Sequence, residues 1–297
     1  MNIGIDLGGS HIALGVVNSE GKILKKYDNE IKEKERENIK KFIETFIIEK
    51  YNECKIEYNI EKIGIAIPGT VNNGEIIRAI NLGLENYKIA EKLMESIDVP
   101  IILKNDGKCA AIAENKFGCI KNIQNALFLT LGTGIGGAVI YNGKLLEAQN
   151  VPGYELGHMI IEKNGRQCKC GNKGCFEQYA SMRALKNEFR EKMNISKETS
   201  GREVMRQIIE NTENTKIKKI VDEFINNLSI GIANLINIFE PEAIGIGGSF
   251  AYYEDTFVPK LKQKLINENL LFNKRDAIII NTAELGNDAG IIGASLL

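Results

Sequence analysis

A chain of 297 residues, 43% of them hydrophobic, is long enough to bury one large core or two modest ones, and we expect two lobes. Its 38 basic and 39 acidic residues give a formal net charge of -1, which excludes recruitment of nucleic acid or an anionic membrane by a global field. No apolar run approaches the ~20 residues of a membrane-spanning helix. The first residues also lack the basic and apolar regions of a secretion signal. We therefore expect a soluble protein of the reducing cytoplasm, in which the six cysteines form no disulfide framework.

The first part of the chain predicts a mixed α/β lobe. Three antiparallel strands are expected at Asn2–Leu7, 12–18 and 22–28, separated by turns rich in glycine and serine. Apolar residues three and four apart then predict a helix over residues 35–54. The remaining elements expected here are a buried strand at Lys62–Ile67, a helix at 86–97, a strand at 99–104 and a helix at 107–117.

The second part begins with a strand at Ala126–Leu131, a glycine-rich turn and a strand at 137–141. Later elements include a helix at 216–239 with one apolar stripe, strands at Ala243–Gly247 and 277–281, and a closing helix at 289–297. A strand followed by a glycine-rich turn occurs twice, at residues 6–10 and 131–134. This repetition predicts two related lobes that face a cleft.

Both glycine-rich turns have features that suit phosphate binding. Asp6 ends the first strand and Gly8-Gly9-Ser10 turns the chain, so backbone amides can approach phosphate oxygens closely. The Asp6 carboxylate can hold Mg²⁺, usually through water, although an ordinary hairpin turn is the alternative. The second turn, GTGIGG at 132–137, satisfies the G-x-G-x-x-G pattern of dinucleotide-binding proteins. A dinucleotide-binding turn must open a helix, whereas residues 137–141 predict a strand, so we expect a strand–turn–strand that clamps a second phosphate.

Asn105 and Asp106 stand where a strand gives way to a helix. Local sequence favours Asp106 as the N-cap of that helix, the commonest role of aspartate at such a place. A carboxylate at the end of a strand is also well placed to accept a proton from an attacking hydroxyl group. Both interpretations stay open on these residues alone.

A histidine and three cysteines have the composition of a closed tetrahedral zinc site: His158, Cys168, Cys170 and Cys175. Four protein ligands leave no open position, so the predicted zinc is structural, with unliganded thiols as the alternative. The loop is basic, which also suits a nucleic-acid-binding knuckle. It lacks the interleaved aromatic residues that stack on bases, and this disfavours that hypothesis.

These motifs, in this order, resemble those of the ROK family of sugar kinases and repressors, within the actin/hexokinase-like ATPase superfamily. The resemblance covers essentially the whole chain. It rests on residues 6–10, Pro68-Gly69, Asn81-Leu82-Gly83, Asn105-Asp106, residues 131–137, residues 155–158, the three cysteines with residues 174–177, residues 247–249 and residues 287–290.

The resemblance implies an α/β, two-lobed actin-like ATPase (ribonuclease H-like) fold with a central cleft and a zinc-binding loop at residues 158–175. The smaller lobe would comprise residues 1–117, completed by a C-terminal helix at about 288–297. The larger lobe would comprise residues 118–287. We also expect a homodimer, and no nucleic-acid or membrane partner.

The implied activity is ATP-dependent phosphorylation of the primary C6 hydroxyl of a hexose, with Asp106 as the general base. Glucose is favoured, and N-acetylmannosamine, another N-acetylhexosamine or mannose is the alternative. The implied sugar ligands are Gly69, Asn81, Asn105, Asp106, Glu155, His158 and Glu177. The implied ligands of ATP and Mg²⁺ are Asp6, Gly8, Gly9, Ser10, Gly132, Thr133 and Gly134, with Gly247 and Gly248 near the adenosine. His158 would bind Zn²⁺ with one ring nitrogen and the sugar with the other.

Two positions depart from the family pattern. Ser10 stands where threonine is more usual but keeps the hydroxyl group, and His11 replaces the usual lysine or asparagine and is expected on a strand surface. The family also contains sugar-responsive repressors, which carry a helix-turn-helix segment ahead of the first phosphate motif. Because a strand begins at Asn2, a transcriptional regulator is the less favoured expectation.

Overall fold

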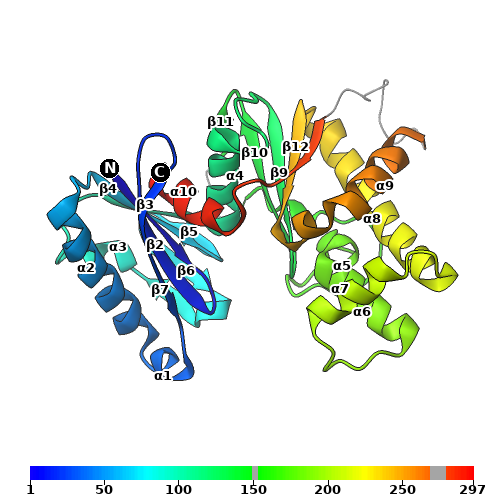
Figure 1. Cartoon of the computed structure of the whole chain (residues 1–297), viewed down its shortest axis with the longest axis horizontal. Helices are drawn as coiled ribbons and strands as arrows, with labels where there is room; N and C mark the ends of the chain where they lie inside the picture. The colour runs from blue at the N-terminus through cyan, green and yellow to red at the C-terminus, as the bar shows by residue number, and fades with distance from the viewer. Residues whose placement is uncertain (149–152, 268–278) are drawn as a thin grey trace. The chain divides into compact units, whose positions relative to one another are not determined.

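A computed structural model describes residues 1–148, 153–267 and 279–297, which fall into two compact units (Figure 1). Unit 1 comprises Met1–Asn122, Leu145–Gly153 and Glu284–Leu297. Unit 2 comprises Ile123–Lys144 and Tyr154–Ala283. Within these described residues, no helix has both the length and the apolar character needed to cross a membrane.

Unit 1 is organised around a five-stranded sheet of order β3-β2-β1-β4-β8. Its strands are β1 (Asn2–Leu7), β2 (His11–Val17), β3 (Ile23–Glu30), β4 (Lys62–Ile67) and β8 (Ile101–Asn105). The first three strands are antiparallel, whereas β1, β4 and β8 run parallel. The predicted bounds of β1 and β4 are confirmed to the residue.

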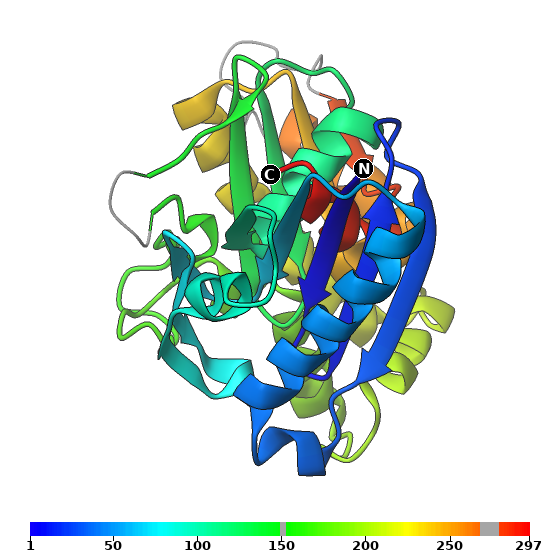
Figure 2. The same ribbon diagram turned by 90° about the vertical axis from the view of Figure 1, so that its left-hand side faces the viewer.

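Successive side chains of β1 point to opposite faces of the sheet and therefore pack in two different layers. Ile3, Ile5 and Leu7 are fully buried in one core with Ile43 and Ile47 of α2 (Ile39–Glu57), which covers that face of the sheet (Figure 2). A short helix, α1 (Glu33–Arg36), precedes α2, so the helix predicted over residues 35–54 is two helices.

On the opposite face of the sheet, the backbone of α10 (Ala289–Ser295) packs directly against the backbone of the strands. Gly4 and Gly64 are register partners on β1 and β4. A Cβ atom at either position would lie 1.8 Å from a carbonyl oxygen of α10, that of Ile291 or Ala294. Only glycine permits this approach, and it places Asp6, on the same side of β1 as Gly4, beside α10.

Helix α4 (Asp106–Phe117) is tied to the segment before α10 by one buried carboxylate. Glu114 is fully buried. It accepts hydrogen bonds from the backbone amides of Cys119 at 2.8 Å, Glu284 at 3.3 Å and Leu285 at 2.9 Å. A buried charge is tolerated when it is hydrogen-bonded in this way. Glu114 therefore fixes α4, whose first residue is Asp106.

Replacement of Glu114 by glutamine is expected to lower the free energy of unfolding by about 2–3 kcal/mol, because its NH₂ group must face an amide donor. Urea denaturation followed by circular dichroism measures this, since the chain has no tryptophan. Glu61→Gln is the matched control, because Glu61 is exposed and forms an ion pair with the N-terminus at 3.2 Å; its effect should stay within about 0.5 kcal/mol. Equal effects of the two substitutions would contradict the role given to Glu114.

Unit 1 also contains elements that the sequence did not predict. A three-stranded antiparallel sheet is formed by β5 (Thr70–Asn72), β6 (Glu75–Ala79) and β7 (Leu84–Tyr87), with a 3-10 turn at Ile80–Leu82. The helix predicted at 86–97 is wrong in its bounds, because β7 extends through Tyr87 and α3 spans only Ile89–Met94. Asn86, with φ of 45°, has a left-handed backbone conformation that no α-helix contains.

Unit 2 repeats the topology of the unit 1 sheet. Its order is β11-β10-β9-β12-β13, and β9, β12 and β13 run parallel while β10 is antiparallel to β9. The strands are β9 (Ala126–Leu131), β10 (Ile135–Tyr141), β11 (Lys144–Leu145), β12 (Ala243–Gly247) and β13 (Ile279–Thr282). A hairpin followed by parallel strands thus occurs in both units. This confirms the relationship that the repeated strand and turn predicted.

Unit 2 also contains α-helices. They are α5 (Glu177–Ala180), α6 (Met182–Met193), α7 (Gly201–Glu210), α8 (Thr215–Phe239) and α9 (Glu254–Asn267). The predicted stripe of α8 is buried from Ile217 to Leu235, as expected of a core helix, and its last residue, Phe239, is half-buried. Of the strand predicted at 277–281, residues 277 and 278 lie outside the described residues.

Candidate functional site

Two aspartates lie at the carboxyl ends of the parallel strands of unit 1. Asp6 on β1 pairs with Ala66 on β4, which pairs with Lys104 on β8, two residues before Asp106. Burial, and next the charge of Asp106, raises the pKa of Asp6 to about 6. The two groups are therefore electrostatic neighbours, and a cation placed beside Asp6 would relieve their repulsion.

The helix that begins at Asp106 takes its N-cap from the preceding residue. Asn105 is the cap, and its Oδ1 accepts a hydrogen bond from the amide of Lys108 at 3.2 Å. The interpretation of Asp106 as the N-cap is wrong, because Asp106 already has helical structure. Its Oδ1 accepts a hydrogen bond from the adjacent amide of Gly107 at 2.8 Å.

The Asp106 carboxyl group lies in an environment that disfavours its charge. Burial raises its pKa above the ordinary value of 3.8, and backbone hydrogen bonds oppose that shift. A carboxylate with a raised pKa is a stronger base than an ordinary aspartate. The structure thus makes Asp106 suited to proton transfer.

Loops of unit 1 converge on the same end of the sheet. Asn105 Nδ2 donates to the carbonyl of Gly69 at 3.2 Å. A Cβ atom on Gly9 would lie 3.1 Å from Cβ of Asn81, so the first glycine turn contacts the loop of Asn81. Arg36 donates to the carbonyls of both Gly9 and Asn81 and so joins these two segments.

In unit 2, the second glycine turn connects β9 to antiparallel β10, as the strand–turn–strand prediction required. A Cβ atom on Gly134 would lie 2.4 Å from Oε2 of Glu177, so this carboxylate lies against the turn. A Cβ atom on Gly248 would lie 2.5 Å from the carbonyl oxygen of Leu131, just before the turn. Glu177 and Gly248 are thus both placed at the β9–β10 turn.

The four predicted zinc ligands form one cluster in unit 2. The ligand atoms of His158, Cys168, Cys170 and Cys175 all lie within 4.8 Å of one another. His158 Nδ1 is 3.6 Å from Cys168 Sγ, and Cys170 Sγ is 3.6 Å from Cys175 Sγ. Tetrahedral zinc with bonds of about 2.3 Å to sulfur separates its ligand atoms by about 3.7 Å. The cluster therefore fits a Zn²⁺ ion closely.

The pKa shifts within the cluster differ from one thiol to another. Burial raises the pKa of Cys175 to about 12 and raises that of Cys168, whereas the backbone amide of Asn172 lowers that of Cys170. A bound divalent metal ion displaces thiol protons and keeps the ligands as thiolates.

The structure distributes the predicted residues between the units. Unit 1 carries Asp6, Gly8, Gly9, Ser10, Gly69, Asn81, Asn105 and Asp106. Unit 2 carries Gly132, Thr133, Gly134, Glu155, His158, Cys168, Cys170, Cys175, Glu177, Gly247 and Gly248. His11 is exposed at the start of β2, and its Nδ1 lies 3.0 Å from Ser10 Oγ. Sequence reasoning missed Arg36 and Gln178, since neither belongs to a recognisable motif.

Comparison with known proteins defines the class. The ROK family model matches residues 2–297, so this chain belongs to the ROK family. It is 30% identical over 308 residues to a glucokinase of Thermotoga maritima, covering 99% of this chain and 95% of that protein. It is also 27% identical to a xylose repressor of Caldicellulosiruptor bescii, covering 98% of this chain and 76% of the repressor.

Solved structures agree with this two-lobed α/β fold. A ROK glucokinase of Streptomyces griseus, in complex with glucose and AMPPNP, is 26% identical with a TM-score of 0.79, covering 99% of this chain and 97% of that one. A protein of Listeria monocytogenes, proposed to be an N-acetylmannosamine kinase, is 28% identical with a TM-score of 0.82 and the same coverage.

Proposed function

We propose that this protein is an ATP-dependent kinase that phosphorylates the C6 hydroxyl of a hexose, preferably glucose, with Asp106 as the general base. The observation that carries the proposal is that two adjacent residues, Asn105 and Asp106, have different hydrogen-bonding roles. Asn105 caps the helix and donates to the Gly69 carbonyl, so the Asp106 carboxylate is not needed as the cap and would serve as the proton acceptor. Similarity to glucokinases supports the same activity.

The proposed reaction needs little covalent chemistry from the protein. Asp106 would accept the proton of the sugar hydroxyl as its oxygen attacks the γ-phosphorus of ATP and ADP leaves. Asn81, Asn105 and Gly69 would orient the sugar, and alignment of this kind supplies much of the rate enhancement in such transfers.

Nucleotide and Mg²⁺ would be held by groups that suit anionic phosphate and a hard cation. Asp6 offers carboxylate oxygen, the ligand type that Mg²⁺ prefers. The turns at Gly8-Gly9-Ser10 and Gly132-Thr133-Gly134 offer backbone amides and two hydroxyl groups. Mg²⁺ supplies charge neutralisation when it is bound, and Gly247 and Gly248 would lie near the adenosine.

His158 would connect the metal cluster to the sugar. Its Nδ1 faces Cys168 and is the nitrogen suited to Zn²⁺, which leaves Nε2 to donate a hydrogen bond to a sugar hydroxyl. Glu155 and Glu177 would bind other hydroxyl groups of the ring. Zinc would then act structurally, by fixing the orientation of one sugar ligand.

Two alternatives have specific support. N-acetylmannosamine or a related N-acetylhexosamine is a possible substrate because of the similarity to the Listeria protein. A sugar-responsive regulator is less favoured, and its support is the similarity to the xylose repressor, which extends over 98% of this chain.

A coupled assay of ADP release tests the function and ranks the substrates. With Mg²⁺ and ATP, we expect the highest kcat/KM for glucose among glucose, mannose, fructose, N-acetylmannosamine and N-acetylglucosamine. A maximum at N-acetylmannosamine would establish the alternative substrate. Absence of sugar-dependent ADP release with every sugar would refute the kinase proposal.

A further inference from the structure

Two groups that are both negative in a metal-loaded protein lie side by side in unit 2. Cys168 Sγ is 3.3 Å from Glu177 Oε1, and the thiol proton can bridge them. A zinc-bound cysteine sulfur and a carboxylate oxygen are both hydrogen-bond acceptors, so two such atoms at this distance need a donor that reaches both.

Gln178 supplies such a donor. Its Nε2 lies 3.5 Å from Cys168 Sγ and 2.9 Å from Glu177 Oε1. Both neighbours are acceptors when the metal is bound, so the NH₂ end of the amide must face them, with one hydrogen for each. No other residue type of this size offers two neutral donors on one atom except asparagine, whose side chain is one methylene shorter.

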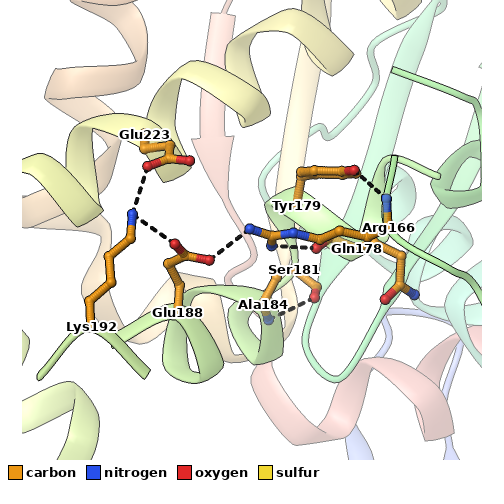
Figure 3. Close-up of polar contacts among 8 residues, drawn as sticks. All are labelled: Arg166, Gln178, Tyr179, Ser181, Ala184, Glu188, Lys192 and Glu223. Carbon is orange, nitrogen blue, oxygen red and sulfur yellow. Dashed lines mark hydrogen bonds and ion pairs between the residues drawn. The ribbon is translucent and has the colours of Figure 1, made fainter. Parts of the chain in front are cut away.

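Arg166, which belongs to the zinc-binding loop (residues 158–175), contacts the backbone of Gln178 (Figure 3). Arg166 Nη1 donates to the Gln178 carbonyl at 3.0 Å, and Nη2 pairs with Glu188 of α6 at 2.7 Å. The Arg166 amide donates to the Tyr179 hydroxyl at 2.6 Å, and its guanidinium lies over the Tyr179 ring, 4.7 Å from the centroid. The loop before Cys168 is thus fastened to α5, which carries Glu177 and Gln178.

We propose that Gln178 is a positioning residue whose side-chain amide bridges the metal-bound Cys168 thiolate and the Glu177 carboxylate, with Arg166 holding its backbone. Gln178 then couples metal affinity to the orientation of Glu177. The metal part of this inference is independent of the activity, whereas the sugar part rests on the proposed function and on the role given there to Glu177.

The test compares full-length wild type with Gln178→Glu, which keeps the shape but replaces the donor with a third acceptor. Zinc affinity is measured by competition with a chromophoric chelator, and the KM values for glucose and ATP are measured separately. We expect zinc affinity to fall by about 10–100-fold, the scale typical of lost partners of metal ligands. The KM for glucose should rise while that for ATP stays within about twofold.

Gln207→Glu is the matched control. Gln207 Nε2 donates to Glu203 Oε1 on α7 at 2.9 Å, so this substitution also places a new carboxylate beside an existing one, away from the metal ligands and with Arg206 paired to Glu203. It should leave zinc affinity unchanged. Gln178→Met, which removes the donor without adding charge, should weaken zinc less than Gln178→Glu does, and Glu177→Gln added to Gln178→Glu should restore part of the zinc affinity.

The outcomes separate the two proposals. Wild-type zinc affinity in Gln178→Glu, or an equal loss in Gln207→Glu, would overturn the role of Gln178. Weakened zinc binding with no sugar-dependent activity in the wild type would support the bridge to Cys168 and refute the kinase function instead. Weakened zinc binding with an unchanged KM for glucose would overturn the coupling to Glu177.

Discussion

Replacement of Asp106 by asparagine is expected to lower kcat for sugar phosphorylation by at least ~100-fold while sugar affinity stays within about twofold of wild type. Asparagine keeps the side-chain oxygen that accepts from the Gly107 amide but cannot accept the proton of the sugar hydroxyl. Steady-state kinetics combined with calorimetric titration of sugar separates these two effects. Near-normal turnover would refute the assignment of Asp106 as the base.

Loss of activity in this variant should not reflect unfolding. Burial raises the pKa of Asp106 above 3.8, so between the unfolded and folded pKa values the folded protein retains a proton that the unfolded chain has lost. Stability due to this group is therefore present at low pH and is lost as pH rises through the folded pKa. At neutral pH the asparagine variant should be at least as stable as wild type. Asp98→Asn is the control, because Asp98 contacts Tyr51 instead and should leave kcat unchanged.

The same shift predicts the pH dependence of wild-type activity. The base must be ionised to act, so kcat should fall as pH decreases through the pKa of Asp106. This acidic limb should lie above the pH expected for an ordinary aspartate. A rate that stays constant down to pH 4 would contradict the raised pKa.

Removal of zinc is expected to raise the KM for glucose by about tenfold or more and to lower the thermal midpoint by about 5–10 °C, because the loop of His158 loses its central crosslink. Metal analysis should find about one zinc per chain in wild type. Cys170→Ser should lose zinc and show the same change in KM.

Cys54→Ala distinguishes loss of zinc from loss of any thiol. Cys54 is buried in the core of unit 1, and its removal should leave the zinc content unchanged. Normal sugar affinity in the metal-free protein would contradict the proposed link through His158.

The central strands could be predicted from the sequence to the residue. β1, β4, β9 and β12 are apolar runs bounded by turn residues, and burial on both faces makes such runs conspicuous. The small sheet β5–β7 was missed because its strands are short and mixed in polarity. Such strands depend on pairing with each other more than on a local pattern.

The composition of the metal cluster could also be predicted, because thiolate and imidazole groups at close spacing have few other uses. The N-cap was predicted one residue too late, at Asp106, since asparagine and aspartate are both good caps and the helix boundary decided in favour of Asn105. The roles of Glu114 and Gln178 could not be predicted from the sequence for a different reason. Their roles come from partners that only the folded chain brings to them.

The central claim is that Asp106 activates a sugar hydroxyl toward ATP, and ³¹P NMR of one reaction mixture tests it most directly. Protein, ATP, Mg²⁺ and glucose should give a hexose 6-phosphate resonance that grows in step with ADP, and the Asp106→Asn protein should give neither at a comparable rate. Phosphate transferred to another hydroxyl, or equal product formation by the variant, would contradict the account.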